Sequence, residues 1–581
     1  MNIKGSPLLI IVCFLVFQSA WSQDSTSVKQ VLYEIFEKLS EHHRDYGDQQ
    51  FRDVSEEAQS AEADYLLGLL NELKQIDVSK LENSDRINFE VFKYELENDY
   101  DVIRQKLYLI PFNAEGGFYN QLSYAIRDQY PDLRGYQRYN DRLRAYPAFF
   151  RSNIKLMEKG LQTGVVAPRI TAENYRVLIE PFMIPEIEQN LFYKPYLKRP
   201  DKIQSDSFEI LRADIQEIIR DSILPLYHSF DEFMTSSYLP NCRDKVGISE
   251  IPGGREIYKQ RIAYFTSLDM SPDDVFNRGQ EEVKRIRSEM EAILKEVGFK
   301  GDFSQFLDFL RTDPQFYVTE PKDLLMHASY IAKRIDGLLP QYFNTLPRLS
   351  YGVQPVPEAI APNYTGGRYS GGSWDSHRAG NYWVNTYKLE SRPLYVLPAL
   401  TLHEAVPGHH LQISLSQEME GLPRFRTHTY ISAFGEGWGL YSEYLGKEMG
   451  IYETPYEDFG RLTYEMWRAC RLVVDVGMHY KGWSKEQAFE FLSSNTALSL
   501  HECNTEINRY IGWPGQAVSY KIGELTIRDL RKRCEQELGD KFDLRKFHDK
   551  VLENGSIPLY VLTSVIEEFI KDEKGNRIEE P

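Results

Sequence analysis

The chain has 581 residues, of which 42% are hydrophobic and 13% aromatic, so it can bury a large core and is not a disordered protein. Its 86 acidic residues outnumber its 68 basic residues, and the formal net charge of −18 argues against a nucleic-acid-binding protein, which needs a basic surface. Peptides, sugars and other small molecules remain possible substrates.

The first 22 residues have the pattern of a secretory signal peptide. A positive charge at Lys4 precedes a short apolar run over 8–17, and the small residues Ala20 and Ser22 occupy the −3 and −1 positions of a cleavage site. The run is too short for a stable membrane anchor, and no later segment is apolar enough to cross a membrane. We therefore expect a secreted or periplasmic protein without stable membrane insertion.

We expect residues 23–581 to form a single large helical domain, with an N-terminal half over about 23–345 and a metal-site half over about 346–581. Most of this chain has the hydrophobic spacing of amphipathic helices. Apolar residues recur three and four positions apart, with charged residues between them, in 26–43, 55–76, 83–109, 137–160, 206–235, 272–297 and 321–337.

Segment 348–388 differs because it is rich in glycine and proline and ends in a run of aromatic and β-branched residues, 381–387, that indicates a strand. An exposed edge of this strand over 381–385 could pair with an extended peptide, although a structural hairpin is the alternative. A helix is expected to begin near Pro398. The sequence thus predicts a mainly α protein with a small β element before that helix.

Three of the chain's 12 histidines, His403, His409 and His410, lie within eight residues of one another. Glu404 follows the first of them. A His-Glu pair on a helix is typical of zinc peptidases, in which the histidine binds the metal and the glutamate acts on the water that the metal activates.

The spacing of these histidines departs from the usual pattern, in which the second histidine comes four residues after the first. That position is Pro407, which cannot continue a helix normally. We expect Pro407 and Gly408 to form a bulge, after which either His409 or His410 returns to the face of the first histidine. The sequence leaves both alternatives open.

A third metal ligand is expected from the helix that opens at 434–443. Glu436 lies 26 residues after His410, a separation typical of zinc peptidases whose third ligand is a glutamate. Glu443 is seven residues further and so lies on the same helical face. It could orient one of the histidines, or it could form a surface salt bridge. Together these residues predict a Zn²⁺ site.

Two later clusters supply candidate substrate-binding residues. Arg468, Arg471, Asp475 and His479 fall within an arc of about 80° on one helix, which is either a solvated face or a buried polar network. The composition favours a network near a cleft, with Arg471 and His479 contacting a substrate. A Trp-Pro-Gly turn at 513–515 separates two further helices. Around this turn the candidates are Arg509, Gln516 and Lys521.

These motifs resemble the bacterial family known as domain of unknown function 885 (DUF885). The resemblance is carried by 403–410, 435–438, 509–510 and 520–521, and it covers most of the mature chain. That family is thought to be related to the mostly helical gluzincin peptidases, including the angiotensin-converting-enzyme-like and thermostable-carboxypeptidase-like enzymes. The resemblance implies a large helical gluzincin-like metallopeptidase fold with a deep cleft between helical halves.

The same resemblance implies a residue that stabilises the tetrahedral oxyanion, because helical gluzincins take this donor from a late segment. Tyr520 is the first candidate and Tyr510 the second. The expected function is a secreted zinc-dependent metallopeptidase that hydrolyses peptide bonds in short peptides, with Glu404 as the general base.

Two alternative functions use the same residues. One is a catalytically inactive metal- or peptide-binding protein on the same fold, which a closed site with both His409 and His410 on the metal would favour. The other is a zinc amidohydrolase that acts on a non-peptide amide.

Overall fold

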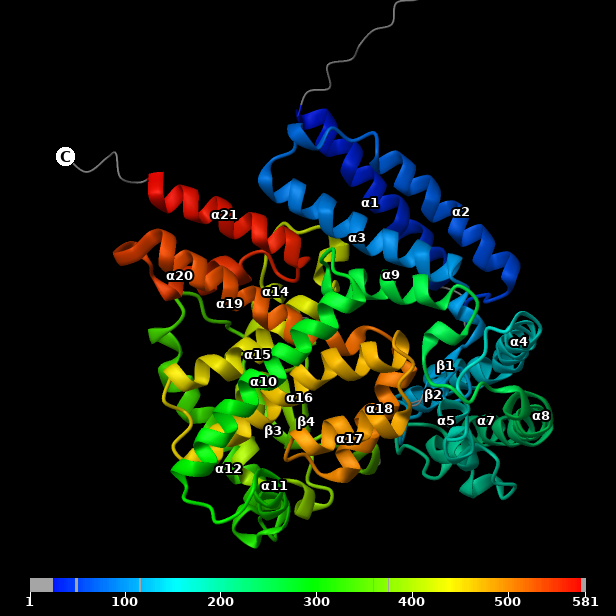
Figure 1. Ribbon diagram of the computed structural model, residues 1–581. Coiled ribbons are helices and arrows are strands. Elements are labelled where there is room, and N and C mark those ends of the chain that lie inside the picture. Colours follow the sequence, from blue (N-terminus) through cyan, green and yellow to red (C-terminus); the bar gives the residue numbers. More distant parts are fainter. Residues whose placement is uncertain (1–24, 48–50, 114–115, 359, 375, 576–581) are drawn as a thin grey trace, which may run out of the picture.

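The computed structural model describes residues 25–47, 51–113, 116–358, 360–374 and 376–575 (Figure 1). The predicted signal peptide lies outside the described residues. Helices dominate the described chain, so the predicted mainly α fold is confirmed. Within the described ranges, none of the helices combines the length and apolar character needed for a membrane span.

The N-terminal half contains all seven helices that the apolar spacing predicts. The helices up to residue 338 are α1 (Ser25–Gly47), α2 (Glu56–Leu73), α3 (Asn83–Arg104), α4 (Leu133–Thr163), α5 (Arg169–Ala172), α6 (Tyr175–Ile179), α7 (Ser205–Ile218), α8 (Leu224–Phe233), α9 (Gly254–Thr266), α10 (Pro272–Glu296), α11 (Phe303–Thr312) and α12 (Pro321–Leu338). The predicted helix 206–235 is interrupted, because a π-helical turn over Ile219–Ile223 joins α7 to α8.

Two small sheets accompany these helices. β1 (Phe112–Asn113) and β2 (Gly116–Gly117) form a short antiparallel pair. β3 (Tyr351–Pro355), β4 (Gly367–Ser370) and β5 (Gly380–Val384) form a three-stranded sheet in the order β3-β5-β4. β5 runs parallel to β3 and antiparallel to β4. The predicted strand over 381–387 is therefore the central strand, and the prediction that it offers a free edge over 381–385 is wrong, because neighbours occupy both of its edges.

The C-terminal half follows this sheet. Its helices are α13 (Leu397–Glu404), α14 (His409–Gln417), α15 (Ser432–Glu448), α16 (Pro455–His479), α17 (Lys485–Asn495), α18 (Leu500–Gly512), α19 (Ser519–Leu538), α20 (Leu544–Leu552) and α21 (Leu559–Gly575). α16 begins with a capping box between Thr454 and Glu457 and is buried from Phe459 to His479. It runs along α10 through the middle of the molecule (Figure 1).

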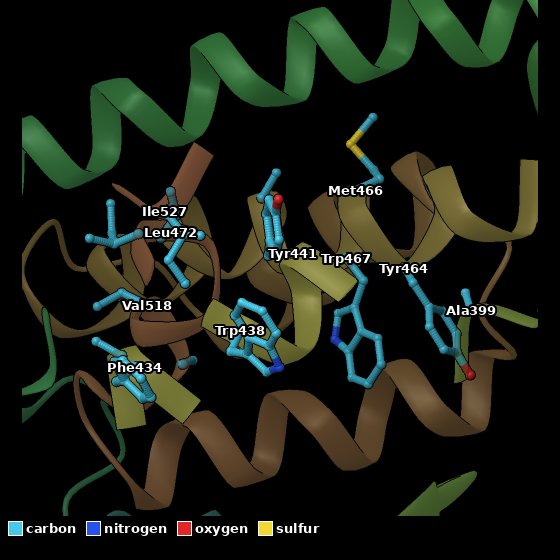
Figure 2. Packing of buried hydrophobic residues seen from close by; sticks show 14 of the residues in the cluster. Ala399, Phe434, Trp438, Tyr441, Tyr464, Met466, Trp467, Leu472, Val518 and Ile527 are labelled. Carbon is cyan, nitrogen blue, oxygen red and sulfur yellow. The ribbon is translucent and has the colours of Figure 1, made fainter. Parts of the chain in front are cut away.

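The main hydrophobic core contains residues from both predicted halves, from Ile87 to Ile570. Figure 2 shows part of this core, where Trp438 packs against Tyr441 and Trp467 packs against Tyr464. A second, strongly aromatic cluster gathers residues between Phe112 and Cys242 and corresponds to the group of α4, α5, α7 and α8 in Figure 1. Helices α13, α14, α15, α16 and α19 all contribute to the main core, which surrounds the candidate site.

Candidate metal centre

The helix that carries the first histidine stops directly after it. α13 ends at Glu404 and α14 begins at His409, so four residues form a turn where a bulge within one helix was expected. Gly408 permits this turn, since a Cβ atom there would lie 1.9 Å from the carbonyl oxygen of His403. Its N–H donates to the carbonyl of Leu402 at 3.0 Å. The chain thus folds back closely onto the end of α13.

This turn brings His409 to His403 and Glu436. One possible ligand atom from each of the three residues lies within 4.8 Å of the others. The Nε2 atoms of His403 and His409 each lie 3.4 Å from Oε2 of Glu436. In a tetrahedral zinc site with bonds of about 2.0–2.1 Å, two ligand atoms stand about 3.3 Å apart. Two imidazoles and one carboxylate at these separations fit Zn²⁺.

His410 does not join this group. Its Nδ1 lies 3.0 Å from the hydroxyl of Tyr369 and 3.3 Å from that of Ser414. Its ring centroid is 4.5 Å from that of Tyr351. Burial lowers the pKa of His410 to about 4, so the ring is neutral at pH 7. The prediction that His410 is a metal ligand is corrected. A residue seven positions after His403 would lie on the same helical face only if one helix continued between them. His410 instead contacts Tyr351 of β3 and Tyr369 of β4.

Buried carboxylates favour positive charge at His403. Glu443, which is 1% exposed, accepts a hydrogen bond from Nδ1 of His403 at 2.8 Å. Burial alone would lower the pKa of His403, but its hydrogen bonds to Glu436 and Glu443 raise it to about 10. Glu443 is thus not a surface salt bridge. Its contact with Nδ1 is the one that orients a metal-binding imidazole, and Arg468 lies 3.4 Å from the same carboxylate oxygen.

The free edge of β4 holds Glu404. Oε2 of Glu404 accepts a hydrogen bond from the backbone N–H of Tyr369 at 2.7 Å. Tyr430, which the sequence analysis did not identify, donates its hydroxyl to Oε1 of Glu436 at 3.0 Å. Its ring packs against Gly435, where a Cβ atom would lie 2.5 Å from the ring. The position of Tyr430 just before the Gly-Glu-Gly-Trp motif was the available signal.

The two candidate tyrosines have different environments. Tyr520 begins the first turn of α19, and its hydroxyl lies 3.4 Å from Nη2 of Arg509. It also interacts electrostatically with Tyr430. Tyr510 is 1% exposed, and its hydroxyl accepts from Nε1 of Trp467 at 2.8 Å and from Nε of Arg471 at 2.7 Å. Tyr510 is therefore engaged in the core, and only Tyr520 lies beside the residues that contact Glu436.

The stripe on α16 is a buried network. Arg471 is 1% exposed, and its Nη2 donates to Glu506 at 3.0 Å. His479 accepts from the N–H of Ile248 at Nδ1 and contacts the carbonyl of Tyr510 through Nε2. Burial lowers the pKa of His479 to about 3, which keeps the ring neutral. The predicted substrate contacts of Arg471 and His479 are corrected, because both side chains are buried and form their hydrogen bonds inside the protein.

Lys521 also has a structural role. It is fully buried, and its Nζ lies 2.8 Å from Glu465, 2.8 Å from Glu524 and 3.2 Å from Glu282. Burial alone would lower the pKa of Lys521, but these carboxylates raise it. This ionic cluster joins α10, α16 and α19. The prediction that Lys521 binds substrate is therefore corrected.

Arg509 and Gln516 remain next to Tyr520. Nη2 of Arg509 donates to Oε1 of Gln516 at 3.1 Å, and Nε2 of Gln516 donates to the hydroxyl of Ser432 at 3.3 Å. Arg509 is partly exposed, whereas Gln516 is buried. Gln516 thus positions Arg509 and leaves the guanidinium at the border of the site.

A cavity of about 50 Å³ lies against the N-terminal part of α13. Leu397 and Leu400 form one wall, and Tyr464 of α16 contributes to another. Its charged lining residues are Arg311, Glu390, Arg392 and Glu502. Leu400 precedes Glu404 by one helical turn, so this mostly apolar cavity is near the candidate site without including the three metal-ligand candidates.

The chain belongs to the family described as bacterial protein of unknown function (DUF885), whose sequence profile matches residues 39–566. A crystal structure of a "putative lipoprotein" from Colwellia psychrerythraea is 26% identical, with a TM-score of 0.83 over 95% of this chain and 100% of that chain. A "putative lipoprotein of unknown function" from Shewanella oneidensis is 19% identical, with a TM-score of 0.66 over 94% of this chain and 100% of that chain, and this likeness shows the fold alone. No curated protein matches the chain.

Proposed function

We propose that this member of the DUF885 family is a zinc-dependent metallopeptidase that works outside the cytoplasm on short peptides. The observation that carries the proposal is the grouping of His403, His409 and Glu436, with Glu404 in electrostatic contact with His403. Three protein ligands leave a fourth zinc position for water or substrate, as in catalytic sites. The placement of His410 outside the group disfavours the closed site of a purely structural metal. The signal-peptide pattern and the likeness to proteins described as putative lipoproteins support the extracytoplasmic location.

The chain's own residues would supply the proton transfers. When bound, Zn²⁺ supplies a Lewis acid that polarises a carbonyl and makes water acidic enough to attack at neutral pH. Glu404 takes a proton from the attacking water and returns it to the leaving amine, while the N–H of Tyr369 holds its carboxylate in place. Tyr520 donates its hydroxyl to the carbonyl oxygen as negative charge develops there, and the nearby Arg509 favours that charge.

The edge position of β4 supports a peptide as the substrate. β5 covers one edge of β4, and the other edge faces Glu404 through Tyr369. Among the described residues no strand lies on this second edge, and the backbone groups of β4 that no side chain occupies can pair with an extended peptide. A peptide on β4 would therefore pass directly in front of the general base.

The proposal is tested with purified mature protein loaded with zinc, alongside Glu404→Gln and the matched control Glu418→Gln. Glu418 lies at the end of α14 and pairs with Arg348 at 3.1 Å, outside the metal group. We expect all three proteins to bind one zinc ion per chain. Only Glu404→Gln should lose cleavage of a short-peptide library, by about 10²- to 10⁴-fold.

Two results would contradict the proposal. If the zinc-loaded wild-type protein and Glu404→Gln are equally inert, a binding protein on the same fold is favoured. If the wild-type protein cleaves non-peptide amides and no peptide, the chain is an amidohydrolase.

A further inference from the structure

Tyr520 is surrounded by arginine side chains, although the chain as a whole carries a net charge of −18. The guanidinium carbon of Arg471 lies 4.2 Å from the centre of the Tyr520 ring, and that of Arg468 lies 6.0 Å away. Arg509 reaches the hydroxyl, and Arg368 interacts with it electrostatically. These arginines are opposite in sign to the net charge of the protein, and they favour an anion where no carboxylate of the protein already pairs with them.

Three of these four arginines have a carboxylate within 4.0 Å, and two of the three share Glu506. The pairs are Arg468 with Glu443 at 3.4 Å, Arg471 with Glu506 at 3.0 Å and Arg509 with Glu506 at 3.6 Å. Arg368 differs, since it forms no ion pair with any residue of the described ranges. Its guanidinium lies 5.2 Å from the centre of the Tyr364 ring, a contact that leaves the N–H groups available. Arg368 is therefore the unpaired positive charge of the group.

Arg368 lies next to the residue that holds the general base. It precedes Tyr369 on β4, and successive side chains of a strand point to opposite faces. Tyr369 is buried, whereas Arg368 is exposed and stands opposite Trp383 of β5. Arg368 also interacts electrostatically with Glu404 and Arg509. An exposed residue with an unpaired guanidinium thus lies on the strand that holds the general base and interacts electrostatically with the proposed oxyanion donor.

We propose that Arg368 and Arg509 form a subsite for a substrate carboxylate beside the scissile peptide bond. The inference rests on the proposed function and adds a substrate class to it. Planar guanidinium groups bind carboxylates through paired hydrogen bonds. Glu506 and Gln516 hold Arg509 in place, and Arg368 supplies the charge that the protein does not neutralise. The carboxylate is either the C-terminus of a short peptide, which defines a carboxypeptidase or dipeptidase, or the side chain of an acidic residue.

Matched peptides distinguish these two sources. One sequence is prepared as the C-terminal acid, as the C-terminal amide, and as the amide with glutamate next to the scissile bond. We expect zinc-loaded wild-type protein to cleave one carboxylate form with a kcat/KM at least about tenfold above that of the plain amide. Arg368→Gln should bring this ratio close to one, and Arg368→Lys should restore part of it. The matched control is Arg151→Gln, because Arg151 is exposed on α4 and has no ion pair within the described ranges.

A binding measurement separates failure of the subsite from failure of the proposed function. Peptide binding is measured by calorimetry on zinc-loaded Glu404→Gln, with and without Arg368→Gln. We expect Glu404→Gln to bind the favoured carboxylate peptide about tenfold more tightly than the amide, and the double variant to lose this preference. Absence of cleavage with every peptide would refute the peptidase, and the binding preference would still decide the subsite. Equal acid-to-amide ratios with and without Arg368, in both cleavage and binding, would overturn the carboxylate subsite.

Discussion

Substitution of Gly439 by alanine should displace the imidazole of His403 and weaken zinc binding. A Cβ atom at Gly439 would lie 2.7–2.9 Å from three atoms of the His403 ring, whereas ordinary contacts begin at 3.4 Å. The ring would have to move by about 0.5–0.7 Å, which exceeds the tolerance of about 0.2 Å for metal–ligand distances. Removal of a residue that hydrogen-bonds a metal ligand already lowers metal affinity by about 10- to 100-fold. We therefore expect Gly439→Ala to lower zinc affinity by at least about 100-fold.

Gly68→Ala is the matched control for this substitution. Gly68 is an exposed glycine within α2, and nothing lies within 4 Å of the added methyl group. Both variants gain about 1 kcal/mol of helix propensity, so they differ in the contact with the ring. Zinc affinity is measured by competition with a chromogenic chelator, and folding is checked by circular dichroism. Wild-type zinc affinity in folded Gly439→Ala would refute the assignment of His403 as a ligand in the described geometry.

Three further predictions address the buried polar groups. Glu443→Gln should lower zinc affinity by about 10- to 100-fold in the same chelator assay, because Glu443 orients the His403 ring. The control Glu448→Gln, on the same helix, should leave zinc affinity unchanged. Equal zinc affinities of the two variants would contradict the orienting role of Glu443. Burial raises the pKa of Asp475 to about 7, so folding takes up a proton and stability falls as pH rises from about 4 to 7. Asp475→Asn removes this pH-dependent loss, which is about 3 kcal/mol of unfolding free energy between pH 5 and 8. Over so long a chain, the Tm of the variant minus that of wild type should therefore rise by about 2 °C between these pH values. A Tm difference that does not change with pH would count against a buried carboxyl at this position. Tyr520→Phe should lower kcat by about 10²- to 10³-fold and leave the zinc affinity unchanged. Tyr510→Phe should instead lower Tm, because it leaves the buried donors of Trp467 and Arg471 without their acceptor. The reverse pattern would make Tyr510 the oxyanion donor and Tyr520 the structural residue.

The helical architecture was predictable because amphipathic spacing is a local signal. The repeats of apolar residues over 83–109 and 272–297 correspond to α3 and α10 within a few residues. Details that depend on neighbouring segments were not predictable. The π-helical turn over Ile219–Ile223 leaves the apolar spacing of 206–235 almost unchanged. The central position of β5 depends on β3, which lies about 30 residues earlier in the chain.

The choice between His409 and His410 shows the limit of a helical projection. An offset of seven residues from His403 favours His410 only if one helix continues through the motif. The structure replaces that helix by a turn, in which Gly408 lies against the carbonyl of His403. The turn ends the helical register at Glu404, and His409 lies against Glu436. Pro407 indicated that the helix is interrupted here. The shape of the interruption depends on contacts with other segments, which a local sequence pattern does not contain.

Burial of the charged residues was the other property that local patterns did not reveal. Arginine and lysine, as at Arg471 and Lys521, bind the carboxylates of a substrate as readily as carboxylates inside the protein. Their partners Glu506 and Glu282 come from α18 and α10, far away in the sequence. Only the tertiary structure shows that these charges are neutralised inside the protein. The tertiary structure also shows that Arg368 has no ion pair among the described residues, whereas the sequence indicated only a glycine-rich loop for its segment.

Close backbone contacts between α15 and α19 determine the distance between the proposed metal ligands and the proposed oxyanion donor. Glu436 is followed by Gly437, where a Cβ atom would lie 2.5 Å from the carbonyl carbon of Gly523 on α19. In turn, a Cβ atom at Gly523 would lie 1.9 Å from the carbonyl oxygen of Ala433. Tyr520 lies one turn before Gly523 on α19, so this glycine contact sets its separation from Glu436. Because the contact joins two helices of the main core, the proposed donor and the proposed metal ligands are held at a fixed separation, as stabilisation of a transition state by preorganised groups requires.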